Sequence, residues 1–154
     1  MRNKQVDDWV SENMVLSDND KRQCVGIAQQ LVEITIDVQR NGLLSIEDKL
    51  LQIKDTFLQK ALSLAFDGAM SPYELRETLQ HDFMADYAAC KKEAAQPSHI
   101  YNVTNTQIKN RELFTRLLIT EGVTEIAKGA NAMQIAVYLA SFFGENYFHI
   151  TDAR

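Results

Sequence analysis

Residues 40–68 read RNGLLSIEDKLLQIKDTFLQKALSLAFDG, and the spacing of their apolar residues decides the fold class. Two runs of apolar residues recur every three or four positions, as on one face of a helix, with a polar break at Lys54 and Asp55 between them. Gly42 and Gly68 bracket the runs, and glycine is the usual residue just past a helix end. The stretch therefore predicts two short helices in succession. The expected inward residues are Leu43, Ile46, Leu50 and Ile53 in the first run, and Phe57, Leu58, Ala61, Leu62, Ala65 and Phe66 in the second.

A longer helix is predicted on each side of this stretch. Before it, Ser17 can cap a helix that runs to about residue 40, with acidic residues in the first turn at the positive end of the helix dipole. After it, Ser71 and Glu74 form a capping box, and the helix that the box opens runs to about residue 92. Each of these helices has an apolar stripe, so each is expected to face a core.

Two further helices are predicted in the last third of the chain. One runs from about residue 105 to Gly129, and the other begins after the capping residue Asn131. The last helix is apolar on most of its sides, so we expect it to be central in the bundle or buried in a partner. The predicted fold is all-α, a compact bundle of five to six helices with one polar linker at residues 93–104. The expected division is an N-terminal arm at 1–16, a single helical domain at 17–143 and a C-terminal tail at 144–154.

Composition narrows the classes of function. The 154 residues carry a formal net charge of −5, and an acidic protein repels phosphate backbones, so nucleic-acid binding is not expected. The two cysteines are far apart, which argues against a disulfide framework and suits buried thiols in the cytoplasm. The longest uncharged run, residues 129–144, is shorter than the ~20 residues of a membrane helix, so no membrane span is expected. No phosphate loop, dinucleotide fingerprint or catalytic triad is evident, and we expect no enzyme activity and no cofactor.

One cluster in the chain has the residue types of a metal site. Asp82, Asp86 and Cys90 share a helical face at i, i+4 and i+8, and His81 lies beside them. A solvated acidic face with a cysteine at the edge of the core explains the same pattern. We therefore predict no metal site and keep a metal-binding enzyme as a remote alternative. The glycines at positions 42, 68, 122, 129 and 144 are interpreted as residues that end helices.

Two blocks of residues occur in the order of a known family. The first contains Arg40-Asn41-Gly42-Leu43-Leu44-Ser45-Ile46-Glu47, then Asp55-Thr56-Phe57-Leu58-Gln59-Lys60-Ala61-Leu62, then Asp67-Gly68 and Glu74-Leu75-Arg76-Glu77-Thr78-Leu79. The second is Glu121-Gly122-Val123-Thr124-Glu125-Ile126-Ala127-Lys128-Gly129-Ala130-Asn131. Both resemble the cytoplasmic part of MotA, the stator protein of the bacterial flagellar motor in the MotA/ExbB/TolQ proton-channel family. The family patterns are R-x-G-L-L-x-L-E, D-P-F-L-K-K-G-L, D-G and E-L-R-E-I-L in the first block, and E-G-x-x-x-I-x-x-G-x-N-P in the second.

The resemblance implies a stator-like domain without the family's membrane helices. In the family, two membrane helices precede the first block and two separate the blocks, whereas this chain has residues 1–20 and the linker 93–104 in those places. Thr56 and Ala132 stand where the family has proline. The resemblance implies a cytoplasmic protein, peripheral to the flagellar motor at the inner membrane, that binds a rotor switch or stator protein. Such a protein would modulate or assist motor assembly or rotation without a proton path of its own.

The mixed charges of the first block and of the helix after Ser71 are interpreted as an electrostatic docking face, because charged faces set partner choice. Ordinary solvent-exposed surface is the alternative for these charges. The alternative function is a helical adaptor or scaffold for another signalling or membrane complex, and a homo-oligomer is left open. The expected partner-binding residues are Arg40, Glu47, Asp48, Arg76, Glu77, Asp82 and Asp86. The expected structural residues are Gly42, Leu43, Leu44, Asp67, Gly68, Ser71, Glu121, Gly122, Gly129 and Asn131.

Overall fold

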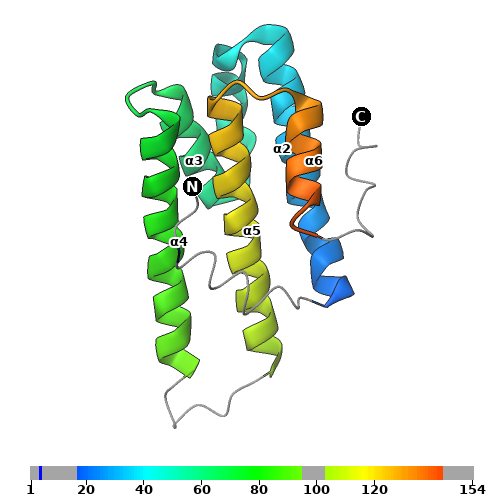
Figure 1. Cartoon of the computed structure of the whole chain (residues 1–154), viewed down its shortest axis with the longest axis vertical. Coiled ribbons are helices and arrows are strands. Elements are labelled where there is room, and N and C mark those ends of the chain that lie inside the picture. The colour runs from blue at the N-terminus through cyan, green and yellow to red at the C-terminus, as the bar shows by residue number, and fades with distance from the viewer. Residues whose placement is uncertain (1–3, 5–16, 95–102, 144–154) are drawn as a thin grey trace.

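The computed structural model describes Lys4, residues 17–94 and residues 103–143. The described residues form helices joined by short turns, with no strand among them, which confirms the all-α prediction (Figure 1). The predicted arm apart from Lys4, most of the linker and the tail, with Gly144, lie outside the described residues. The helical segments are α2 (Asp18–Asn41), the 3₁₀ helix η1 (Leu43–Gln52), α3 (Thr56–Phe66), α4 (Pro72–Ala94), α5 (Val103–Ala127) and α6 (Ala132–Ala140).

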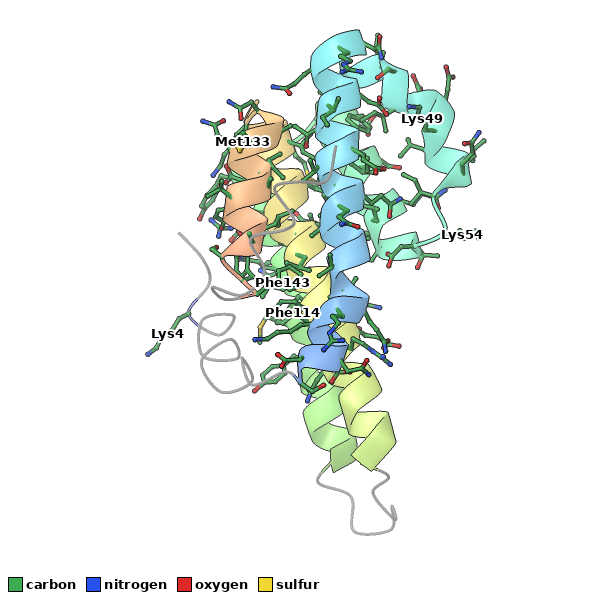
Figure 2. The ribbon with its side chains drawn as sticks, turned by 90° about the vertical axis from the view of Figure 1, so that its right-hand side faces the viewer. Lys4, Lys49, Lys54, Phe114, Met133 and Phe143 are labelled. Atoms are coloured by element: carbon green, nitrogen blue, oxygen red, sulfur yellow. The ribbon has the colours of Figure 1, made fainter. Side chains whose placement is uncertain are left out.

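Helix α5 is the centre of the bundle. It contacts α2, α3, α4 and α6, and every residue from 117 to 124 is buried (Figure 1). Near the middle of α5, Phe114 meets Phe143, from the turn after α6, in an edge-to-face contact with ring centroids 5.2 Å apart (Figure 2). A helix enclosed on several sides needs no single apolar stripe, and α5 accordingly carries buried polar residues as well as buried leucines.

For the last helix, α6, two places were expected, at the centre of the bundle or buried in a partner; the first is wrong, and the second stays a prediction. Ile135 and Leu139 face the core, but Met133 and Val137 are 60% and 51% exposed. Figure 2 shows α6 at the side of the bundle, with Met133 on its outer surface. The apolar residues on its outer face have no neighbour among the described residues that buries them.

Three predicted helix starts, at Ser17, Ser71 and Asn131, are confirmed by their capping hydrogen bonds. Ser17 Oγ accepts a hydrogen bond from the Asp20 amide at 3.2 Å. The capping box at Ser71 is complete, since Ser71 Oγ accepts from the Glu74 amide and the Glu74 carboxylate accepts from the Ser71 amide at 2.9 Å. Asn131 forms a second capping box with the residue three positions on. These bonds satisfy amide donors that the first turn of a helix otherwise leaves without partners.

The first short helix of the 40–68 stretch has 3₁₀ rather than α geometry. Of its expected inward residues, Ile46 is buried, Leu50 and Ile53 pack at the edge of the core, and Leu43 is exposed. A 3₁₀ helix has about three residues per turn against 3.6 in an α-helix, so over ten residues its side chains drift by about half a turn from the α-helical stripe that the spacing predicts. The second short helix, α3, buries Phe57, Leu58, Ala61 and Leu62 as predicted. Among the described helices, none is both long and apolar enough to cross a lipid bilayer.

Candidate functional site

The corner between α2 and η1, at the cyan end of the bundle, is the first candidate surface (Figure 1). Gly42 makes the corner with φ of +81°, a conformation that residues with a Cβ adopt only at a cost, and its amide donates to the Val38 carbonyl at 2.8 Å. Arg40, Glu47 and Asp48 are exposed around it. The structure thus brings three of the expected partner-binding residues to one end of the molecule.

Exposed leucines lie among these charges. Leu44 and Leu51 are 78% and 89% exposed, and Leu43 is also exposed. No ion pair within the described residues involves Glu47 or Asp48, whereas the neighbouring Lys49 pairs with Asp37 on α2 at 2.5 Å. We define the corner surface as Arg40, Leu43, Leu44, Glu47, Asp48 and Leu51. Apolar side chains with unpaired charges around them are typical of protein-binding surfaces.

The expected charges on α4 do not form one face. Glu77 is exposed, but Asp82 pairs with Lys60 of α3 at 2.5 Å, and Asp86 pairs with Arg116 of α5. These side chains are one third to one half exposed, so each pair contributes little to stability. The two carboxylates nevertheless have partners inside the chain, at the seam between α4 and its neighbours.

Arg76 lies inside the fold rather than on the docking face. Its guanidinium Nη2 donates to both carboxylate oxygens of Glu121 on α5, at 2.8 and 2.7 Å. The hydroxyl of Tyr138 on α6 donates to the same carboxylate at 2.9 Å. The side chains of Arg76 and Glu121 are 12% and 1% exposed. We call these three residues the polar triad; it joins α4, α5 and α6.

Gly122 does not end a helix, so its interpretation as a helix-ending residue is wrong; it has a packing role instead. It lies in the middle of α5, and a Cβ at this position would approach Leu31 Cδ1 of α2 to 2.8 Å. The missing side chain allows α2 and α5 to pack closely. By contrast, Gly68 and Gly129 do end helices, with φ of +66° and +86°.

The other structural residues lie at helix ends. Asp67 is the C-terminal cap of α3, and its amide donates to the Ser63 carbonyl at 3.1 Å. Leu43 and Leu44, expected from the family pattern to be structural, instead contribute to the corner surface. Their exposure leaves Ile46 as the buried anchor of η1.

The residues on α4 that have the types of a metal site do not come together. His81 is exposed, Asp82 and Asp86 have the partners named above, and the Cys90 side chain lies outside the described residues. No group of three metal-binding side chains occurs in the part of the chain that the structure describes.

A cleft of about 560 Å³ beside the N-terminus of α3 has no counterpart in the sequence patterns. Cys24 forms part of its wall, with Lys54, Arg111 and Arg116 around it. Burial raises the pKa of the Cys24 thiol, and its sulfur lies 3.6 Å from the hydroxyl of Thr115. Arg111 and Arg116 each have an acidic partner, Asp20 and Asp86, so the cleft presents no uncompensated positive charge from its arginines.

The chain shares its fold with a solved structure, that of C. jejuni MotAB. The two match with a TM-score of 0.57 at 16% sequence identity, over 94% of this chain and 77% of the other. At this identity the likeness concerns the fold. No protein-family model matches the sequence, and no curated protein matches it. A MotA-like fold, which the two sequence blocks imply, is therefore confirmed, whereas the correspondence to the cytoplasmic part of MotA stays a prediction.

Proposed function

We propose that this chain is a non-catalytic MotA-like protein that acts on the cytoplasmic side of the flagellar motor. It binds a rotor switch or stator protein there, through the corner surface, and modulates or assists motor assembly or rotation. The observation that carries this proposal is the fold likeness to C. jejuni MotAB over 94% of the chain.

The corner surface supports the proposal in two ways. It lies in the first family-like block, and Arg40, Glu47 and Asp48 are exposed there without ion-pair partners among the described residues. Unpaired charges at the rim of an interface accelerate association and set partner choice, while Leu44 and Leu51 offer apolar area to bury. Arg76, Asp82 and Asp86 have partners inside the chain, so we place the docking face at the corner rather than on α4.

Binding kinetics with purified motor proteins test the proposal. The chain is immobilised and exposed to the rotor switch protein and to the stator proteins, at low and physiological salt. We expect Glu47→Lys to slow association roughly tenfold at low salt, because reversing a charge at the rim acts mainly on the rate of encounter.

Glu112→Lys is the matched control. Glu112 is also an exposed glutamate, but it lies within α5 and outside the corner surface, so its reversal changes the net charge equally without altering a corner residue. Equal effects of the two reversals would show that only overall charge matters. Absence of binding to any of the motor proteins, by a chain that is folded by circular dichroism, would refute the proposal.

A helical adaptor for another complex is the second candidate. The exposed Met133 and Val137 on α6 favour it, because they offer an apolar contact outside the corner surface. This candidate predicts a partner whose binding is lost in Met133→Asp and unaffected by Glu47→Lys.

A further inference from the structure

The polar triad combines both family-like blocks in one contact. Arg76 belongs to the first block and Glu121 opens the second, 45 residues later. Tyr138, outside both blocks, brings α6 into the same contact. We propose that the polar triad is a positional lock, which fixes the rotation of α6 about its axis instead of adding net stability to the fold.

Buried ion pairs are a poor source of net stability. Removing a carboxylate and a guanidinium from water costs about as much as their attraction returns, unless every remaining donor is satisfied. Here the buried Nε of Arg76 and the buried Nε2 of Gln80, one turn further along α4, have no hydrogen-bond partner among the described protein atoms. An incompletely satisfied network of this kind argues for a role other than stability.

Hydrophobicity determines the rotation of helix α6 only weakly, because large apolar side chains lie on both its inner and its outer face. Ile135 and Leu139 face the core, while Met133 and Val137 face outward and are nearly as apolar. A rotated α6 would bury Met133 and Val137 in place of Ile135 and Leu139 at similar gain, so only the small Ala136 and Ala140 distinguish the two rotations by hydrophobicity. Tyr138 breaks this equivalence, because only one rotation brings its hydroxyl within hydrogen-bond distance of Glu121.

The other polar contacts of this region hold the ends of α6. Asn131 caps its start, and Lys21 Nζ on α2 donates to the Phe143 carbonyl just after its end, at 3.2 Å. With nine residues, α6 is also shorter than helices that are stable by themselves. Its conformation therefore depends on the bundle, and its rotation on the triad.

Replacing the polar triad with apolar side chains tests whether it fixes the rotation of α6 or stabilises the fold. The triple variant Arg76→Met, Glu121→Leu, Tyr138→Phe is compared with Glu121→Leu alone. The single variant leaves a buried guanidinium without its carboxylate, so we expect its unfolding equilibrium constant to rise roughly 100-fold or more. In the triple variant we expect that constant to stay within about tenfold of the wild type. Amide hydrogens of α6, and only those, should then exchange at least about tenfold faster.

Tyr138→Phe gives a milder test that does not depend on the triple variant folding. It removes one oxygen and keeps the ring, which packs edge-to-face on Phe142 at 5.3 Å. Tyr73→Phe is the control, since Tyr73 is 69% exposed at the start of α4. Faster exchange confined to α6 in Tyr138→Phe alone supports the lock. Unchanged α6 exchange in Tyr138→Phe, or a triple variant as unstable as Glu121→Leu, would overturn it.

Discussion

Replacing Gly122 by alanine sets two effects of known size against each other. Alanine in the interior of a helix is favoured over glycine by about 1 kcal/mol. At this position, however, the added methyl group would lie 2.8 Å from Leu31 Cδ1, whereas ordinary contact begins near 3.4 Å. Leu31 is completely buried, so it has little room to move aside.

Overpacking of this kind costs about 1–3 kcal/mol, which exceeds the gain in helix propensity. We therefore expect Gly122→Ala to lower the free energy of unfolding by about 1 kcal/mol, measured by urea denaturation. Gly26→Ala is the matched control. Gly26 lies inside α2 with nothing within 4 Å of an added Cβ, so the same substitution should there raise the free energy of unfolding by about 1 kcal/mol.

The cause is checked by removing the opposing side chain. Leu31→Ala costs about 2–5 kcal/mol by itself, and it also makes room for the new methyl group. In the double variant Leu31→Ala, Gly122→Ala, we expect a loss about 1–2 kcal/mol smaller than the sum of the two single losses. If Gly122→Ala stabilises the chain as much as Gly26→Ala does, the close packing of α2 on α5 at this glycine is refuted.

Three further predictions concern single residues. Ser71→Ala should lower the free energy of unfolding by about 1 kcal/mol in urea denaturation, because the Glu74 amide at the start of α4 loses the hydroxyl that accepts its hydrogen bond; an unchanged midpoint would contradict the capping box. Gly42→Ala should cost about 1–2 kcal/mol in the same assay, since φ of +81° is strained for alanine; no loss would mean that the corner relaxes freely. Desolvation raises the pKa of the Cys24 thiol in the folded state above the ordinary value of 9.0. The neutral thiol therefore contributes fully to stability below about pH 9, and this contribution is lost as the pH rises through the folded-state pKa. Urea midpoints above pH 9 should therefore fall more for the wild type than for Cys24→Ala, and equal slopes would contradict the burial of the thiol.

The helix boundaries could be predicted because their causes are local. Ser17, Ser71 and Asn131 each bond to the residue three positions on, so the signal and its partner lie within one turn. Gly42 and Gly68 likewise act on their own backbone. Such features depend on neighbouring residues alone, and they follow from the sequence without knowledge of the packing.

The buried polar residues, and the helix that lies at the centre of the bundle, could not be predicted in the same way. Arg76 and Glu77 are adjacent in a run of mixed charge, yet a helix turns about 100° between them, so one enters the core and the other meets solvent. Nothing near Arg76 in the sequence identifies Glu121 as its partner. The central position of α5 was missed for a similar reason, because enclosure by four neighbours removes the one-sided pattern that indicates a buried face.

The most direct test of the proposed function is to identify the proteins that associate with the full chain in its own cells. The chain is cross-linked in living cells, purified, and compared with Glu47→Lys and Glu112→Lys by quantitative mass spectrometry. We predict that rotor switch or stator proteins are the enriched partners, and that Glu47→Lys alone reduces their recovery. Enrichment of proteins unrelated to the motor, or equal recovery of motor proteins with all three chains, would contradict the proposal.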